Sequence, residues 1–537
     1  MEFNYITRKE ALKTMGVLGL SPMLPKFVKS FPQQKKPNII LILCDQFRAD
    51  ACKREGFALD TTPFLDSLAQ SGTWFNKSYC AAPACAPSRA SLLTGRFPNA
   101  TKVKSNWNIQ DAVYSKDVFD AVKTQGYMTG VIGKTQHSFL KFHPERFDYF
   151  KTFGHLGEPG TEDEEGEKFN AYLRSTHFYA DLKPAPFPSE MEQPYRIVSD
   201  GIKWIDSIKN QDNPFFLYLS IPEPHNPYQV TEPYYSLFPP DKLPSLQAGP
   251  EALKAKGKKF TMQRQLEDMG YPGFEKQIPR IRSNYYGMLR LIDDQMKRLV
   301  DSLKENNQYE NTILLFVADH GDYTGEYGLI KKGAGVPECL TRIPMLWHGP
   351  QIAKNKLPHD AHVSNVDIMP TICDIVGYQL PEGVIGRSLW PLLKGKEYPR
   401  AEFASIVVQH GFGGRDYTSI DQIDPYKEGC LEKGKHEFDE LNSYSQSGIL
   451  RMLRKDDWKL VYNMQGNGKL YHLSEDRAEV NNLYNDKKYE NKKLELLQDM
   501  MSWELRTQDP LPLPRQRYIY RGDKHNYWTP YSDPDVM

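Results

Sequence analysis

Four apolar runs of strand length constrain the fold of this 537-residue chain more than any other feature. The runs are residues 38–44, 129–132, 215–220 and 312–318. Each is rich in Ile, Leu, Val and Phe, lacks polar alternation and stops abruptly at polar residues. Such strands are buried on both faces, as in a mostly parallel sheet that is covered by helices. The sequence therefore predicts an α/β protein with one large, mostly parallel sheet sandwiched by helices.

Polar side chains follow each of the four runs. In chain order they are Asp45 and Gln46, Lys134, His225, and Asp319 and His320. Ligands of open α/β sheets bind beyond the carboxyl ends of the strands. We therefore expect these side chains to meet at one edge, although any single pair is what an ordinary loop after a strand also contains.

The chain between the third and fourth runs predicts a crossover helix, because apolar residues recur there at spacings of three and four. These residues are Tyr285, Leu289, Ile292, Met296, Leu299 and Leu303. Segments 141–195 and 228–280 are rich in Pro, Gly and charge. We interpret both segments as long surface excursions rather than domains.

The character of the chain changes near residue 398. Short strand-like pieces at 458–462 and 470–473 flank the turn Gly466-Asn467-Gly468, which is typical of a hairpin. A helical stretch, 492–505, follows. The sequence thus predicts a large domain over residues 36–397 and a smaller C-terminal α+β domain with an antiparallel sheet over residues 398–537.

Length and charge exclude some classes of function. The chain is too long to be a small binding module. Lys plus Arg and Asp plus Glu both number 68, so the net charge is zero, which argues against nucleic acid as the natural partner. Seven cysteines are too few for a disulfide scaffold of this length.

Residues 1–30 have the pattern of a targeting segment. Arg8, Lys9 and Lys13 precede a short apolar run, 15–20, and the stretch resembles a twin-arginine export signal with Lys in place of the second Arg. We expect export, to the periplasm; the alternative is a short amphipathic helix that stays attached. No later segment has the length and apolarity of a membrane span.

The segment 85–96 places a cysteine at the start of a helix. Cys85 stands two residues before Pro87, Leu92 and Leu93 form an apolar face, and Gly95 is placed to end the helix. Backbone N–H groups and the helix dipole favour an anion at this position. Taken alone, Cys85 is a candidate activated thiol, a packing residue or half of a disulfide.

The pentapeptide Cys-Ala-Pro-Ser-Arg at 85–89, continued by Leu-Leu-Thr-Gly-Arg at 92–96, resembles the signature of type I sulfatases. These belong to the alkaline phosphatase superfamily, so the resemblance implies an alkaline-phosphatase-like fold. It also implies that Cys85 is oxidised to Cα-formylglycine by a formylglycine-generating enzyme or an anaerobic sulfatase-maturating enzyme.

The resemblance further implies a metal site. Type I sulfatases hold calcium with an N-terminal Asp-Asp pair, a later Asp-Asn or Asp-His pair and an oxygen of formylglycine. The matching ligands here are Asp45, Gln46, Cys85 (as formylglycine), Asp319 and His320. Gln46 departs from the Asp-Asp pattern, a change that also resembles phosphonate monoester hydrolases. We expect Ca²⁺, with Mn²⁺ as the alternative.

Further residues match sulfate-binding and proton-transfer positions of the family. Lys134, Lys332 and Arg89 would neutralise the sulfate, and Arg89 would also orient the formylglycine hydrate. His225 would protonate the leaving oxygen, and His137 would act as the base that releases sulfate from the sulfo-enzyme. Two residues separate Lys134 from His137 where many sulfatases have one, which resembles iduronate-2-sulfatase-like bacterial polysaccharide sulfatases.

The resemblance implies a sulfated polysaccharide or oligosaccharide as substrate, with the C-terminal domain contributing to the cleft. One alternative is a phosphonate or phosphate ester hydrolase that uses the same site. The other is a non-catalytic protein that binds sulfated glycans and never matures Cys85. His410 and Arg415 either contact a second anionic group or belong to an ordinary loop.

Overall fold

The computed structural model describes residues 35–157, 163–176, 179–417, 424–426, 430–431, 438–508 and 524–528. The expected export segment, residues 1–30, lies outside these ranges. Among the described residues, no helix combines the length and the apolarity that a membrane crossing requires.

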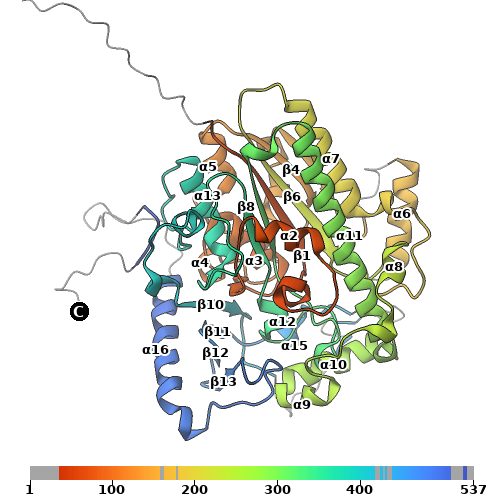
Figure 1. The fold of residues 1–537 in the computed structure, drawn as a ribbon. Coiled ribbons are helices and arrows are strands. Elements are labelled where there is room, and N and C mark those ends of the chain that lie inside the picture. The colour runs from red at the N-terminus through yellow and green to blue at the C-terminus, as the bar shows by residue number, and fades with distance from the viewer. Residues whose placement is uncertain are drawn as a thin grey trace, which may run out of the picture. The chain divides into compact units, whose positions relative to one another are not determined.

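A seven-stranded sheet lies at the centre of the fold (Figure 1). In spatial order its strands are β2 (Thr73–Trp74), β8 (Met345–His348), β7 (Thr312–Ala318), β1 (Asn38–Asp45), β6 (Phe215–Pro224), β4 (Met128–Lys134) and β5 (Tyr149–Phe153). The strands from β7 to β5 run parallel to their neighbours, whereas β8 pairs antiparallel with both β7 and β2. The predicted mostly parallel sheet is confirmed.

The four apolar runs of the sequence become the adjacent strands β7, β1, β6 and β4. Every residue of β1, β6 and β7 is buried, as strands covered on both faces must be. Because these strands are parallel, their carboxyl ends lie at one edge of the sheet, which is where the polar side chains follow.

Helices cover both faces of this sheet (Figure 1). Helices α7 (Gln193–Ile208) and α11 (Ile278–Glu305) pack against one face, and α5 (Val118–Thr124) and α13 (Ile368–Val376) lie on the other. The apolar stripe predicted for residues 285–303 is buried along α11, so the predicted crossover helix is confirmed.

The remaining helices are mostly short. They are α2 (Pro63–Gln70), α3 (Cys85–Thr94), α4 (Pro98–Thr101), α6 (Glu164–Ser175), α8 (Tyr234–Leu237), α9 (Leu253–Lys256), α10 (Lys258–Gly270), α12 (Glu338–Thr341), α14 (Trp390–Leu393), α15 (Ser443–Gln446) and α16 (Glu490–Thr507). Two short parallel strands, β3 (Ser78–Tyr79) and β9 (Val363–Ser364), pair outside the large sheet.

A second, antiparallel sheet follows residue 400. Its strands are β10 (Ser405–His410), β11 (Leu450–Lys455), β12 (Trp458–Asn463) and β13 (Gly468–His472). The predicted hairpin joins β12 to β13, with Tyr462 opposite Gly468. Helix α16 packs on this sheet and buries Leu496, Met500 and Trp503. The predicted smaller antiparallel sheet is confirmed.

Three strands of the large sheet, β2, β8 and β5, were not expected. β5 lies in the segment 141–195, which we interpreted as a surface excursion, and it pairs with β4 at the edge of the sheet. Four of its five residues are only partly buried. An edge strand needs no fully apolar run, so its sequence carries no strong strand pattern.

Candidate active site at the carboxyl edge of the sheet

Cys85 is the first residue of α3, and its side chain is fully buried. Ala84 before it is extended, and the helix ends at Gly95, which adopts a left-handed φ of 66°. Glycine takes this conformation without the Cβ clash that other residues suffer. The predicted position of the sulfur at a helix N-terminus is therefore correct.

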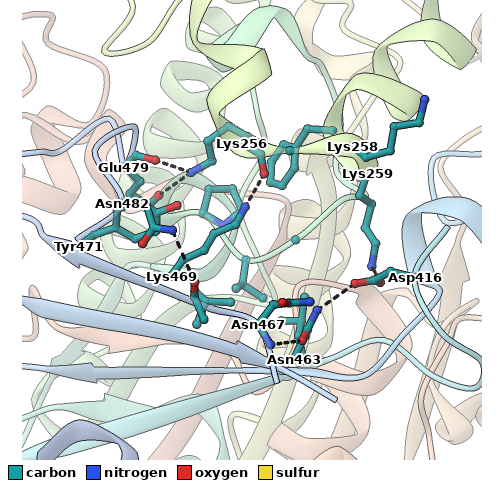
Figure 2. Close-up of a pocket in the computed structure, with 18 of the residues that line it drawn as sticks. Lys256, Lys258, Lys259, Asp416, Asn463, Asn467, Lys469, Tyr471, Glu479 and Asn482 are labelled. Carbon is teal, nitrogen blue, oxygen red and sulfur yellow. Dashed lines mark hydrogen bonds and ion pairs between the residues drawn. The ribbon is translucent and has the colours of Figure 1, made fainter. Parts of the chain in front are cut away.

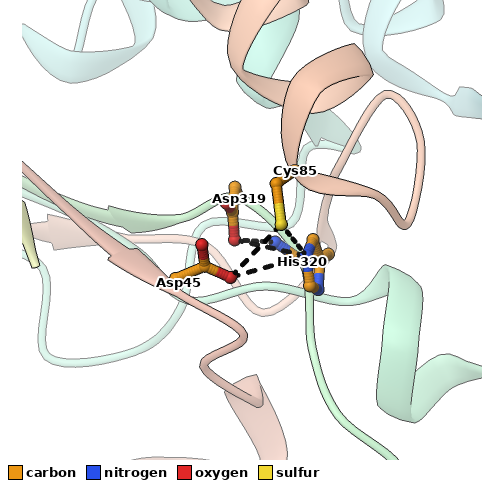
Figure 3. A group of neighbouring side chains, drawn as sticks. All are labelled: Asp45, Cys85, Asp319 and His320. Atoms are coloured by element: carbon orange, nitrogen blue, oxygen red, sulfur yellow. Dashed lines mark hydrogen bonds and ion pairs between the residues drawn. The ribbon is translucent and has the colours of Figure 1, made fainter. Parts of the chain in front are cut away.

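Four buried donor groups meet at this point: Asp45, Cys85, Asp319 and His320 (Figure 3). One donor atom of each lies within 4.8 Å of the others. Cys85 Sγ is 3.3 Å from His320 Nε2 and 3.6 Å from Asp45 Oδ1. Asp45 ends β1 and Asp319 follows β7, so the parallel strands bring these two carboxylates together.

This donor set fits a divalent cation. His320 Nδ1 donates to the carbonyl oxygen of Gly321 at 2.8 Å, which leaves Nε2 facing the carboxylates. Burial disfavours the charged imidazolium, yet Asp319 and Cys85 outweigh it and raise the pKa of His320 to about 9. Two carboxylates beside an imidazole are ligands that oxygen-preferring cations accept.

Arg89 holds both carboxylates in place. Its Nε donates to Asp319 Oδ2 at 2.8 Å, and one terminal nitrogen donates to Asp45 Oδ2 at 3.1 Å. The other terminal nitrogen donates to Ser220 Oγ at 2.7 Å and to the carbonyl of Lys134. The guanidinium thus contacts groups of the protein itself, one turn after Cys85 on the same helix.

Gln46 adopts a left-handed φ of 69°, and its amide points between two buried groups. Its Oε1 accepts a hydrogen bond from Lys332 at 2.9 Å, and its Nε2 donates to Asp322 at 2.5 Å. Tyr228 donates to the same oxygen of Asp322 at 2.7 Å. The side-chain oxygen of Gln46 is therefore engaged by an ammonium group, and its part in a metal site stays a prediction.

Two buried lysines, Lys134 and Lys332, contact different groups of the site. Lys134, at the end of β4, contacts Asp45, and its Nζ is 3.8 Å from Cys85 Sγ. Burial raises the pKa of the Asp45 carboxyl, but Lys134 and the other nearby cations hold that pKa well below its usual range. The Nζ of Lys332 is 2.9 Å from each of three groups: Gln46 Oε1, His225 Nε2 and Glu440 Oε1.

Three histidines form a row beside Lys332. The rings of His225 and His155 stack with centroids 3.8 Å apart, and His137 lies beyond, 6.3 Å from His155. His225 Nδ1 donates to the carbonyl of Asn226 at 2.6 Å, so its Nε2 accepts from Lys332. Burial and the neighbouring Lys134 lower the pKa of His137 to about 2, and burial likewise keeps His225 neutral by lowering its pKa. Among the described residues, His137 makes no hydrogen bond to Cys85.

A family model described as Sulfatase matches residues 37–378. The chain belongs to the sulfatase family. As a member, it is a sulfuric ester hydrolase. This sulfatase is 26% identical to the arylsulfatase of Clostridium perfringens, in a match that covers 85% of this chain and 92% of the relative. It is also 26% identical to the ulvan-active sulfatase of Formosa agariphila, in a match that covers 81% of this chain and 84% of the relative.

The fold of this sulfatase matches that of the phosphonate monoester hydrolase of Agrobacterium radiobacter with a TM-score of 0.71. The match covers 88% of this chain and 96% of the other at 22% identity. The predicted alkaline-phosphatase-like fold is confirmed.

Three buried residues of the sulfatase site escaped the sequence analysis. Glu440 reaches Lys332 from the C-terminal part, His155 stacks on His225, and Asp322 supports Gln46. Asp322 has a signal in the sequence, since it follows Asp319 and His320 at the end of the same strand. Glu440 and His155 stand alone in loops without a motif. His410 is buried at the end of β10, and Arg415 is exposed.

Proposed function

We propose that this sulfatase hydrolyses sulfate monoesters of a sulfated polysaccharide or oligosaccharide. The observation that carries the proposal is the position of Cys85, whose sulfur lies between two carboxylates, His320 and the ammonium group of Lys134. The activities for which the arylsulfatase and the ulvan-active sulfatase are named support the reaction and a polysaccharide substrate.

We propose that Cys85 is converted to formylglycine, whose hydrate supplies one hydroxyl as nucleophile for sulfur and a second that allows the sulfate to be released. The maturing partner is a formylglycine-generating enzyme or an anaerobic sulfatase-maturating enzyme. The burial of Cys85 supports conversion before the folded chain closes over this residue.

Asp45, Asp319, His320 and residue 85 would hold a divalent cation, with calcium as our choice and manganese as the alternative. The cation would neutralise negative charge on the sulfate oxygens. Gln46 would add a neutral oxygen. The contribution of Arg89 is to fix the two carboxylates, because its hydrogen bonds tie Asp45 to Asp319.

Lys134 and Lys332 would bind the sulfate oxygens and align the sulfur with residue 85. His225 would protonate or hydrogen-bond the leaving oxygen, and its Nε2 lies 2.9 Å from the ammonium group of Lys332. His137, which burial and Lys134 keep unprotonated by lowering its pKa, would accept the proton that is lost when sulfate departs.

We also propose the division of the chain at residue 398, with the smaller domain contributing to the substrate cleft. The contact between Glu440 and Lys332 supports this contribution. Export to the periplasm remains our proposal from the pattern of residues 1–30.

The deciding experiment is a mass measurement of the peptide that contains residue 85, isolated from protein made in its native host. Replacement of the CH₂SH group by an aldehyde supports the proposal. A thiol that is still fully alkylatable would contradict it and favour a glycan-binding protein without catalysis.

A second measurement separates the two ester classes. Rates on an aryl sulfate and on an aryl phosphonate monoester, measured with the same preparation, should favour the sulfate. A preference for the phosphonate would instead support the alternative, a phosphonate or phosphate ester hydrolase, whose fold type this chain shares.

A further inference from the structure

A basic cavity of about 280 Å³ lies between α9, α10 and the antiparallel sheet (Figure 2). Lys256, Lys259 and Lys469 line it together with Phe260 and Tyr471. None of the residues that surround Cys85 lines this cavity. It is therefore a separate site, and its volume lies just below the usual range for small-molecule pockets.

The positive charge of this cavity is only partly balanced. Lys259 pairs with Asp416 at 2.7 Å. Lys256 lies 4.0 Å from the carboxylate of Glu479, which is held more closely by Lys459, at 2.6 Å. Lys459 also pairs with Glu338, at 3.0 Å. The cavity wall thus has two carboxylates, Asp416 and Glu479, and four lysines: Lys256, Lys259, Lys469 and the exposed Lys258.

Among Lys256, Lys259 and Lys469, the positive charge of Lys469 is the least balanced. Its ammonium group donates to the carbonyl oxygen of Lys256 (Figure 2), and no carboxylate among the described residues lies within 4 Å of it. Burial and the repulsion from Lys256 lower the pKa of Lys469 to about 8. Burial also lowers the pKa of Lys256 and that of Lys259. An anion between these groups would relieve the repulsion and restore full protonation.

The cavity also has an apolar wall. Phe260 and Tyr471 are largely buried, and Val461 and Pro337 stand beside them. Aromatic and aliphatic surface next to ammonium groups suits a molecule that has both an apolar face and an anionic substituent. A pyranose ring that carries a sulfate or carboxylate has this combination, whereas inorganic sulfate has no apolar face.

The cavity is joined to the site around Cys85 through the backbone. Gln263 of α10 donates to the carbonyl of Lys332 at 2.9 Å and accepts from the amide of Ala334 at 2.6 Å. The next residues, 335–337, form part of the cavity wall. One turn earlier on α10, Lys259 lines the same cavity, so the chain that leaves Lys332 leads directly into it.

We propose that this cavity binds a sulfated or carboxylated saccharide unit, through Lys469, Lys256 and Lys259. If the proposed function holds, this unit belongs to the same anionic glycan whose sulfate ester is hydrolysed at residue 85. The cavity then selects substrates with a second anionic group and disfavours singly charged esters.

The test is calorimetric titration of the full-length protein with sucrose octasulfate and, separately, with inorganic sulfate at equal ionic strength. Lys469→Gln removes the charge and keeps most of the side chain. The matched control is Lys254→Gln, because Lys254 is exposed on α9 and does not line the cavity. We expect about tenfold weaker binding of sucrose octasulfate to K469Q, as for the loss of one charge-assisted hydrogen bond, and no change for K254Q.

A site-specific readout accompanies the titration. Sucrose octasulfate should slow the acylation of Lys469 by an N-hydroxysuccinimide ester at pH 8, and leave that of Lys254 unchanged. If K469Q does not fold by circular dichroism, Lys259→Gln takes its place.

Equal affinity of wild type and variant would overturn the proposal, as would absence of protection at Lys469. If inorganic sulfate binds as tightly as sucrose octasulfate, with the same dependence on Lys469, the site takes free sulfate and the saccharide assignment fails. These titrations involve no turnover. Failure of the proposed function would instead appear as an unconverted Cys85 and no hydrolysis of aryl sulfate, whatever the titrations give.

Discussion

Two clusters of positive side chains, one around Cys85 and one in the basic cavity, differ in how their charge is balanced. Around Cys85, Lys134 and Arg89 contact Asp45, and Lys332 contacts Glu440, all in the fully or nearly fully buried interior. In the cavity beside α10, Lys469 donates to a carbonyl oxygen and lies over the Phe260 ring, and no carboxylate among the described residues lies within 4 Å of its ammonium group.

This difference indicates two kinds of task. Charges that are paired and hydrogen-bonded can stay in a dry interior, where fixed dipoles and cations stabilise a developing charge without rearrangement. Charges that lack a close carboxylate are held in the cavity wall at a cost, and an incoming anion improves their energy. The first cluster therefore suits chemistry, and the second suits binding.

The largest expected effect is that of Cys85→Ser. Serine can accept sulfate but lacks the second hydroxyl that releases it, so turnover should fall by about a thousandfold or more. Mass spectrometry should detect the sulfated serine after incubation with an aryl sulfate. Full steady-state turnover by C85S would refute the mechanism, whereas binding of sucrose octasulfate in the cavity should not change.

Removal of the proposed cation should have the second-largest effect. Chelation should abolish hydrolysis and lower the thermal midpoint by a few degrees, because the buried carboxylates and His320 lose the ion that binds only the folded state. Calcium added back should restore both properties better than manganese does. Hydrolysis that persists after exhaustive chelation would mean that the four donor groups hold no essential ion.

Glu440→Gln tests the link between the C-terminal part and the reaction. The Lys332 ammonium raises the acidity of Glu440, whose pKa falls to about 2 although burial acts against this. Without the carboxylate, Lys332 loses one of its three fixed partners, and we expect kcat to fall by about tenfold with a smaller change in KM.

The control for this variant is Glu397→Gln, since Glu397 is exposed and belongs to neither cluster. Equal kcat for E440Q and the wild type would show that Lys332 is positioned without Glu440. A parallel loss of thermal stability in E440Q alone, with kcat unchanged, would give this residue a purely structural role.

The smallest expected effect is that of ionic strength, which should act differently on the two clusters. Raising the ionic strength from about 0.05 to about 0.5 M shortens the Debye length to a few ångströms and screens accessible charges far more than buried ones. Binding of sucrose octasulfate should weaken by about fivefold or more, and kcat on an aryl sulfate should change by less than about twofold. If salt weakens binding and lowers kcat by the same factor, the two clusters do not differ in how their charge is balanced.

The sequence predicted the central strands and the meeting of their polar ends because these depend on local patterns. Runs such as 312–318 are apolar throughout, and a parallel sheet brings their carboxyl ends to one edge whatever lies between them. Edge strand β5 was missed because it is only half buried. The order of the strands has no local signal either.

The candidate site shows the same division. Asp45, Cys85, Asp319 and His320 could be named in advance because each stands in a motif or at a strand end. Glu440 and His155 could not, because their roles arise only where the folded chain brings a loop against Lys332 or His225. The sequence also could not show that the hydrogen bonds of Arg89 go to the carboxylates of the site.

The backbone amide of Asp319 donates to the carbonyl oxygen of Cys44 at 3.1 Å, so the pairing of β1 with β7 continues up to the two carboxylates. Their separation is thus set by the spacing between neighbouring strands and is independent of the chain that connects them. Insertions or deletions in the intervening loops can remodel substrate selection over evolutionary time while the reacting centre keeps its dimensions.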